Sequence, residues 1–257
     1  MRQLVDLTGK NIMVTGASQG IGRAVAELCV ELGATVTLLD LQVEPLHAFL
    51  GELGADRAIG LAGSVTDRDT VETLVKQSVQ KFGGIDGLVN NAGITRTAMA
   101  LKMNIDEWQQ VIDVHLTGAF HCLQAVGRVM VERYKENPEA SGAIVNISSD
   151  AGRRGTRGQI NYGTAKAGVL GMTMSAALEW ASYNIRVNTV AFGVVETPMT
   201  EVIRSDRFRE GSLAKIPIGR FGLPDEVAKP VVFLLSDAAS YISGQHLSVS
   251  GGAFMAS

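Results

Sequence analysis

Seven short runs of β-branched and aliphatic residues, separated mostly by longer stretches with helical periodicity, organise this sequence of 257 residues. They are NIMVTG (11–16), TVTLLD (35–40), AIGLAG (58–63), GLVNNAG (87–93), AIVNISS (143–149), IRVNTVAF (185–192) and HLSVSGG (246–252). Strands that alternate with helices form parallel sheets covered on both faces. We therefore predict an α/β fold with a doubly wound, mostly seven-stranded parallel sheet, whose ligands lie beyond the carboxyl ends of the strands.

The length and composition predict one domain over residues 1–257. The charged, amphipathic stretch at about 198–216 interrupts the alternation, and we expect it to cover the substrate as a mobile segment. The formal net charge of −3 gives no overall attraction to nucleic acid or an anionic membrane. No apolar run reaches the roughly 18 residues of a membrane span. The two cysteines indicate no disulfide framework, and the four histidines lack metal-ligand spacing. We expect a cytoplasmic protein without a metal centre.

A glycine-rich turn, TGASQGIG (15–22), follows the first predicted strand and leads into a helical pattern. Its glycines permit a tight turn and close backbone approach, while the helix N-terminus offers N–H groups and a positive dipole end to a pyrophosphate. An ordinary strand-to-helix connection is the alternative. Asp40, 18 positions after Gly22 at the end of the second strand, favours a dinucleotide site, because its carboxylate can accept hydrogen bonds from both adenosine ribose hydroxyls.

Asp40 also predicts NAD(H) rather than NADP(H), because a carboxylate there repels a 2′-phosphate. The neighbouring positions Ser18, Gln19 and Leu41 supply no positive charge for such a phosphate. The alternative for Asp40 is a solvated carboxylate that caps the next helix.

Three further motifs follow in order: NNAG (90–93) after the fourth strand, Ser149 at the end of the fifth, and YGTAK (162–166) thirteen residues later. Together with TGASQGIG, they make the chain resemble the short-chain dehydrogenase/reductase family over essentially its whole length. The resemblance implies a Rossmann-fold enzyme that moves hydride between a nicotinamide and a secondary alcohol or ketone. It also implies that Ser149, Tyr162 and Lys166 form the catalytic triad.

The chemistry of this triad can be argued from the residue types. A phenol with a pKa of roughly 10 is a poor base at neutral pH, and a nearby cation lowers that pKa. Lys166 lies four residues after Tyr162 and therefore on the same helical face, where its ammonium can stabilise the phenolate and reach the nicotinamide ribose. Ser149 then holds the substrate oxygen. A solvated Tyr–Lys helical pair is the alternative.

The resemblance further implies a set of cofactor contacts. Ile21 offers a backbone N–H to the pyrophosphate, while Val195 and Thr197 hold the carboxamide. Asn90 and Ala92 pass beside the adenosine ribose, with Val65 at the adenine edge. The complete set comprises Gly16, Ser18, Gln19, Gly20, Ile21, Asp40, Ser64, Val65, Asn90, Asn91, Ala92, Gly93, Tyr162, Lys166, Val195 and Thr197.

The sequence departs from the family pattern at three positions. His115 stands where the family usually has an Asn that anchors a water in the proton relay, so it is either a catalytic, pH-sensitive substitute or a neutral histidine packed beneath the site. Phe192 replaces a common Pro and can line the pocket. Ser64 replaces an Asp that often meets the adenine amino group, which predicts a weaker contact.

The segment from Ile216 to Gly252 resembles a subgroup that includes 3-oxoacyl-carrier-protein reductases, hydroxyacyl-CoA dehydrogenases and sugar or polyol dehydrogenases. The carrier-protein reductases generally use NADPH and dock the acidic carrier through an arginine where this chain has Leu178. Asp40 and Leu178 therefore make an NADPH-dependent carrier-protein reductase the second reading, behind an NAD(H)-dependent enzyme for a hydroxyacyl or oxoacyl thioester.

Arg153, Arg154 and Arg157 lie between Ser149 and Tyr162 and give two readings. Guanidinium groups bind phosphates and carboxylates well, which favours a coenzyme A thioester or another anionic small molecule as substrate. A solvated or subunit-contacting surface is the alternative. The resemblance also implies a homotetramer, with helices around 107–134 and 161–182 at one interface and the C-terminal strand region at another. A non-catalytic dinucleotide-binding scaffold is disfavoured because both Tyr and Lys are present.

Overall fold

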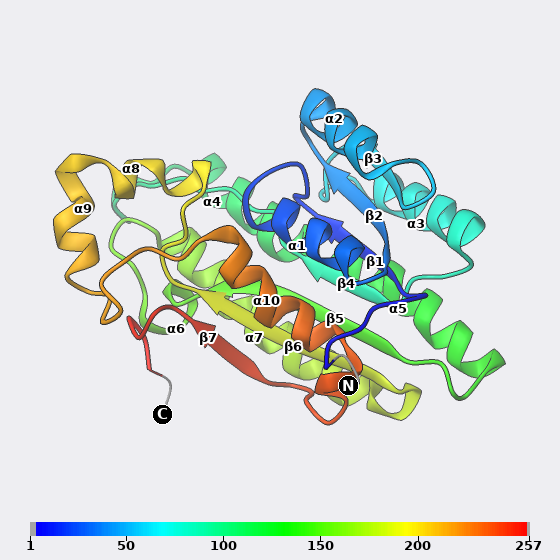
Figure 1. The fold of residues 1–257 in the computed structure, drawn as a ribbon. Helices are drawn as coiled ribbons and strands as arrows, with labels where there is room; N and C mark the ends of the chain where they lie inside the picture. Colours follow the sequence, from blue (N-terminus) through cyan, green and yellow to red (C-terminus); the bar gives the residue numbers. More distant parts are fainter. Residues whose placement is uncertain (1–3, 256–257) are drawn as a thin grey trace.

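The computed structural model describes residues 4–255, and its seven strands form one parallel sheet in the order β3-β2-β1-β4-β5-β6-β7 (Figure 1). The strands are β1 (Asn11–Thr15), β2 (Thr35–Asp40), β3 (Ala58–Ala62), β4 (Gly87–Asn90), β5 (Gly142–Ser149), β6 (Ile185–Phe192) and β7 (His246–Val249). All seven predicted strands are present, and the predicted fold class is confirmed.

Helices cover both faces of the sheet (Figure 1). One apolar core joins the sheet to α1 (Gly20–Glu31), α2 (Val43–Leu53) and α10 (Pro224–Leu235), and the other joins it to α3 (Arg68–Phe82), α5 (Ala119–Glu136) and α7 (Ile160–Trp180). Strands β1 and β4 are buried along their whole length, as expected for a parallel sheet between two helical layers. The chain adds β2 and β3 on one side of β1 and the strands from β4 onward on the other side, so the strand order reverses between β1 and β4. Such a reversal leaves a crevice at the carboxyl ends of these two strands.

The sequence predicted one continuous helix over about 107–134, but the structure has three consecutive helical segments there. Helix α4 (Ile105–Ile112) passes into a π-helical segment (Asp113–Gly118) before α5 begins. A Cβ at Gly118 would lie 2.5 Å from Val65 Cγ2, so the glycine permits the segment to approach the loop after β3. Apolar periodicity predicts helix equally well in both geometries, so the sequence did not reveal the π turn.

Short helices surround the carboxyl ends of the strands. Helix α6 (Ala151–Arg154) directly follows β5, and a 3₁₀ turn (Pro198–Thr200), α8 (Glu201–Arg204) and α9 (Asp206–Leu213) follow β6. The last three elements form the segment predicted to cover the substrate. Within residues 4–255 we find no helix whose length and apolar character would let it cross a membrane.

A partly buried arginine ties the end of α10 to β6. Arg186 Nη1 donates to the carbonyls of Leu234 (2.8 Å) and Ile242 (3.5 Å), and Nη2 donates to those of Leu235 (3.5 Å) and Ser236 (3.0 Å). Burial lowers the pKa of this guanidinium, but the carbonyls at the negative end of the helix dipole hold the charge there.

We expect Arg186→Leu to lower the free energy of unfolding by about 2–3 kcal/mol, because several buried carbonyls lose a charged donor. The matched control is Arg57→Leu, since the exposed Arg57 donates to a single carbonyl, that of Val30, at 2.7 Å. Chemical denaturation of both variants checks this prediction. Equal losses in the free energy of unfolding would show that the buried contacts of Arg186 contribute no more to stability than the exposed contact of Arg57.

Candidate active site

The glycine-rich turn brings β1, β4 and α1 close together. Gly16 has a φ of +63°, and a Cβ on it would lie 2.9 Å from Ala92 Cα. A Cβ on Gly22 would lie 2.0 Å from the Gly16 carbonyl oxygen, so no larger residue fits there without a shift of the backbone. Helix α1 begins at Gly20 and has no side-chain cap from Gln19, so its first N–H groups are free to bind an anion.

The Asp40 carboxylate ends β2 at the edge of this crevice. Its Oδ2 accepts a hydrogen bond from the Ser18 N–H and its Oδ1 accepts one from the Gln42 N–H, both at 2.9 Å. These bonds fix the orientation of the carboxylate. The alternative that Asp40 caps the next helix is wrong, because α2 begins at Val43 with Gln42 as the preceding residue.

A cleft of about 400 Å³ runs from Asp40 to the end of β6. The predicted residues that line it are Gly16, Gln19, Gly20, Ile21, Asp40, Ser64, Val65, Asn91, Ala92, Gly93, His115, Ser149, Tyr162, Lys166, Phe192, Val195 and Thr197. Ile94 and Ile147 also line it and were not predicted from the sequence, while Met199 belongs to the predicted covering segment. Ile94 and Ile147 contribute backbone carbonyls, for which a sequence carries no signal.

The cleft fits a dinucleotide. At one end the uncapped N-terminus of α1 and the glycine turn can hold a pyrophosphate, and at the Asp40 end a fixed carboxylate faces the space for a ribose. Among the described residues that line the cleft, Lys166 is the sole cationic side chain. Within residues 4–255, no group of three or more His, Cys, Asp or Glu side chains is placed to hold a metal ion.

Two predicted cofactor residues do not line this cleft. Ser18 is buried and contributes its backbone N–H to Asp40. Asn90 is buried at the end of β4, where its Nδ2 donates to Asn146 Oδ1 (2.8 Å) and to the Ala119 carbonyl (3.2 Å). Both residues therefore form hydrogen bonds within the protein beneath the cleft and do not lie on its surface.

The three triad residues converge from two elements. Ser149 ends β5, while Tyr162 and Lys166 lie in the first turns of α7. Lys166 is buried, its Nζ donates to the Ile147 carbonyl at 2.7 Å, and Nζ lies 5.6 Å from the centroid of the Tyr162 ring. The alternative of a solvated Tyr–Lys pair is therefore wrong.

Burial sets the protonation of this pair in the cofactor-free protein. It raises the pKa of the Tyr162 phenol, and a hydrogen bond from Ser149 opposes that rise. It lowers the pKa of Lys166 to about 7. The expected lowering of the phenol pKa by the lysine is absent here, because removing both groups from water disfavours both charged forms.

His115 lies in the π-helical segment and packs edge-on against the Tyr162 ring, with 5.1 Å between ring centroids. Its Nε2 lies 2.7 Å from the Ile94 carbonyl oxygen and 3.1 Å from the Ile94 nitrogen, so it donates to the carbonyl in one tautomer and accepts from the N–H in the other. Burial, and secondarily the charge of Lys166, lowers the pKa of His115 well below its ordinary value. This direction favours a neutral ring, and with it the reading of His115 as a neutral histidine packed beneath the site over the reading as a pH-sensitive substitute.

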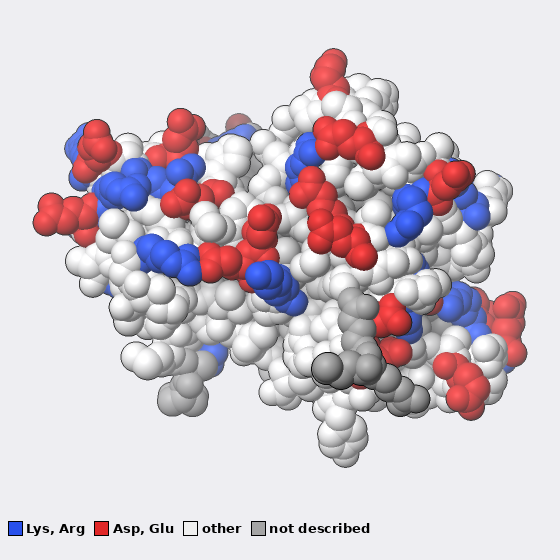
Figure 2. Space-filling view, viewed as in Figure 1, with Lys and Arg blue, Asp and Glu red and all other residues white. Residues whose placement is uncertain are grey.

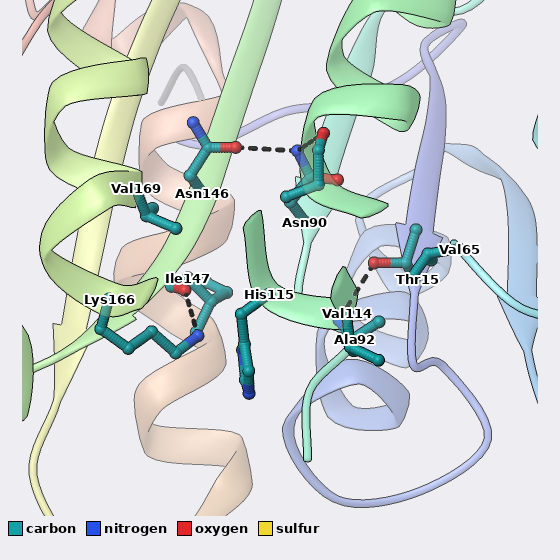
Figure 3. Close-up of a pocket in the computed structure, with 11 residues that line it drawn as sticks. Thr15, Val65, Asn90, Ala92, Val114, His115, Asn146, Ile147, Lys166 and Val169 are labelled. Carbon is teal, nitrogen blue, oxygen red and sulfur yellow. Dashed lines mark hydrogen bonds between the residues drawn. The ribbon is translucent and has the colours of Figure 1, made fainter. Parts of the chain in front are cut away.

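His115, Lys166, Asn90 and Asn146 are among the residues that line a small void of about 10 Å³ (Figure 3). In Figure 3 the end of the Lys166 side chain points toward the His115 ring, and Asn90 and Asn146 lie above them. His115 Nδ1 and Asn90 Oδ1 are buried and have no hydrogen-bond partner among the described protein atoms. A void of this size holds about one water molecule.

The three loop arginines are exposed, and none of them lines the cleft. Arg153 places its guanidinium over the Phe254 ring, 5.1 Å from the ring centroid. Arg154 Nη1 donates to the Ala253 carbonyl at 3.4 Å. These two side chains therefore contact the end of the chain.

A glycine turn at a helix N-terminus, a carboxylate at the end of β2 and a buried Ser–Tyr–Lys set together define a dinucleotide-dependent oxidoreductase. Residues 16–253 match the family model described as "Enoyl-(Acyl carrier protein) reductase". The chain belongs to the short-chain dehydrogenase/reductase family, as its motifs predicted.

Several relatives carry a common name. The chain is 46% identical to the 3-oxoacyl-[acyl-carrier-protein] reductase of Thermotoga maritima, over 96% of this chain and 98% of that protein. It is 44% identical to the reductase of the same name from Vibrio harveyi, over 98% and 100%. Both relatives span nearly the whole chain, so the predicted oxidoreductase function is confirmed.

Solved structures agree with this assignment. A short-chain type dehydrogenase/reductase from Mycobacterium marinum is 33% identical, with a TM-score of 0.90 and coverage of 97% of both chains. A short-chain dehydrogenase/reductase from Brucella melitensis, described as glucose/ribitol dehydrogenase, is also 33% identical, with a TM-score of 0.90 and coverage of 98% and 99%.

Proposed function

We propose that this chain interconverts 3-oxoacyl and 3-hydroxyacyl thioesters with NAD(H) as its cofactor. The fixed carboxylate of Asp40 at the edge of the cleft carries the cofactor assignment. The 3-oxoacyl substrate is supported by the names of relatives at 46% and 44% identity. The nicotinamide, when bound, donates hydride to the substrate carbonyl carbon or accepts it from the alcohol carbon.

The residues of the cleft handle the proton and the substrate oxygen. In reduction, Tyr162 gives its phenolic proton to the oxygen that becomes the hydroxyl, and in oxidation the phenolate takes that proton back. Ser149 donates a hydrogen bond to the same oxygen. The ammonium of Lys166 stabilises the phenolate that remains after proton transfer. The uncapped N-terminus of α1 holds the pyrophosphate.

His115 acts in this proposal as a positioning residue. In the tautomer whose proton lies on Nε2 and is donated to the Ile94 carbonyl, Nδ1 is an acceptor without a partner among the described protein atoms, and the ring lines the void together with Lys166. A single water there can donate to His115 Nδ1 and accept from the Lys166 ammonium. Such a water would join the Lys166 ammonium to His115 and so help to hold the ammonium in place.

A carrier-bound thioester would need a basic surface on this protein to bind the acidic carrier, whereas a small thioester such as an acyl-CoA would not. Leu178 on α7 is 84% exposed, so it presents an apolar side chain where a basic residue would attract an acidic carrier. On the face in Figure 2, Lys and Arg side chains alternate with Asp and Glu over α8, α9 and α10, so no continuous basic area forms on the described part of that face. Both observations favour a small thioester.

A covering role for residues 198–216 and a homotetramer remain part of the proposal. Pro198, Met199 and Thr200 line the cleft at the start of the covering segment. Met174 on α7 and Phe120 on α5 are exposed apolar residues, which supports the packing of these helices against a second copy.

Asp40→Ser tests the cofactor assignment. We expect kcat/KM with NADH to fall about tenfold or more, because hydrogen bonds from the ribose hydroxyls to a charged acceptor contribute about 1.5–3 kcal/mol. The activity with NADPH should rise, because the repulsion of its 2′-phosphate is removed. Asp56→Ser, which removes an exposed carboxylate outside the cleft, is the matched control. A wild-type preference for NADPH would overturn the assignment.

A further inference from the structure

A turn that follows β7, Ser250–Phe254, packs against the segment that follows Ser149. The Phe254 N–H donates to Ser250 Oγ at 3.1 Å, which closes the turn Ser250–Phe254. Arg153 of α6 stacks on the Phe254 ring, and Arg154 donates to the Ala253 carbonyl. Two of the three loop arginines therefore hold this turn against α6.

The same turn reaches the loop after β6 and the end of the covering segment. The Gly193 N–H donates to the Val249 carbonyl at 3.2 Å, and a Cβ on Gly193 would lie 3.0 Å from Ser250 Cα. The Ile218 N–H donates to the Gly251 carbonyl at 3.2 Å, and Gly251 has a φ of +63°, which favours glycine.

Helix α6 in turn packs on the catalytic part of α7. A Cβ on Gly152 would lie 2.6 Å from the Lys166 carbonyl carbon, so the two backbones are in direct contact. The Ala151 N–H donates to Ser149 Oγ at 3.2 Å. A displacement of α6 would therefore move the Ser149 hydroxyl relative to Lys166.

We propose that the turn Ser250–Phe254 is an intramolecular latch that holds α6 against α7 and anchors the end of the covering segment. Arg153 and Phe254 are positioning residues, because they contact each other and act on the triad through α6. The latch gives Arg153 and Arg154 a role that requires no anionic substrate. The latch positions the catalytic residues for any alcohol or ketone that the enzyme turns over. The inference therefore does not depend on the assignment of a thioester as the substrate.

Kinetics of Arg153→Ala, Phe254→Ala and the double variant test the latch, on a charged and an uncharged substrate that the wild type turns over. We expect each single variant to lower kcat about tenfold on both substrates, because small misplacements of catalytic groups have effects of this size or larger. The Kd of the cofactor should stay the same. The double variant should lose no more than either single variant, because the two residues make one contact.

Conservative variants separate positioning from general loss of structure. Phe254→Tyr keeps the ring and should retain the wild-type kcat, and Arg153→Lys should recover part of it. Lys81→Ala is the matched control, since Lys81 lies 5.5 Å from the Phe82 ring centroid on α3, outside the cleft. Its kcat should not change.

Cleavage by trypsin reports on the mobility of the covering segment, which contains Arg204, Arg207 and Arg209. Phe254→Ala should be cut there faster than the wild type. Three kinetic results would contradict the latch: a wild-type kcat in both alanine variants, additive losses in the double variant, or a loss in Arg153→Ala that is confined to the charged substrate. Cleavage of Phe254→Ala by trypsin at the wild-type rate would contradict it as well.

Discussion

Replacing Tyr162 with phenylalanine is expected to lower kcat by about a thousandfold, because the general acid and base of the reaction is lost. The ring itself remains, so its edge-on contact with His115 and the shape of the cleft are preserved. The Kd of the cofactor should therefore stay near that of the wild type. Steady-state kinetics together with a binding titration check both expectations.

The matched control for this variant is Tyr183→Phe. Tyr183 packs edge-on against Tyr134, with 5.8 Å between ring centroids, and does not line the cleft. Its kcat should equal that of the wild type. Undiminished turnover in Tyr162→Phe would show that another group transfers the proton.

Lys166→Met is expected to lower kcat about a hundredfold and to change the pH profile of ketone reduction. Reduction needs the protonated amine, and burial lowers the pKa of Lys166 to about 7 in the cofactor-free protein. The ammonium is thus present below that pH and lost above it. We expect kcat/KM of the wild type to fall as the pH rises through about 7, while the variant keeps a low and flat profile.

The variant should fold, because methionine fills a similar volume and removes a buried charge. A wild-type profile that does not fall above neutral pH would contradict the role of the Lys166 ammonium. So would the same descending limb in the methionine variant.

The sheet and the position of the triad could be predicted because they depend on local patterns. Alternating strands and helices fix a parallel sheet, and residues that end adjacent parallel strands, such as Asp40 and Thr15, meet at one edge. A four-residue spacing in a helix places Tyr162 and Lys166 on one face. These inferences need no knowledge of tertiary packing.

Other features depend on burial and on contacts between distant segments. The neutral state of His115 arises because the π-helical segment turns the ring into the interior beside Ile94, which no residue pattern reveals. The lowered pKa of Lys166 likewise results from burial rather than from a neighbouring charge. The contacts of Arg153 with Phe254 join positions 101 residues apart in the sequence.

The central claim is that hydride passes between NAD(H) and a 3-oxoacyl thioester in this cleft. Its most direct test mixes the purified protein with acetoacetyl-CoA and either NADH or NADPH and follows the oxidation of the reduced cofactor, with a neutral sugar or polyol and NAD⁺ assayed in parallel. We predict rapid oxidation of NADH, slower oxidation of NADPH and little turnover of the sugar or polyol. Preference for NADPH, or turnover of the sugar or polyol without turnover of the thioester, would contradict the proposal.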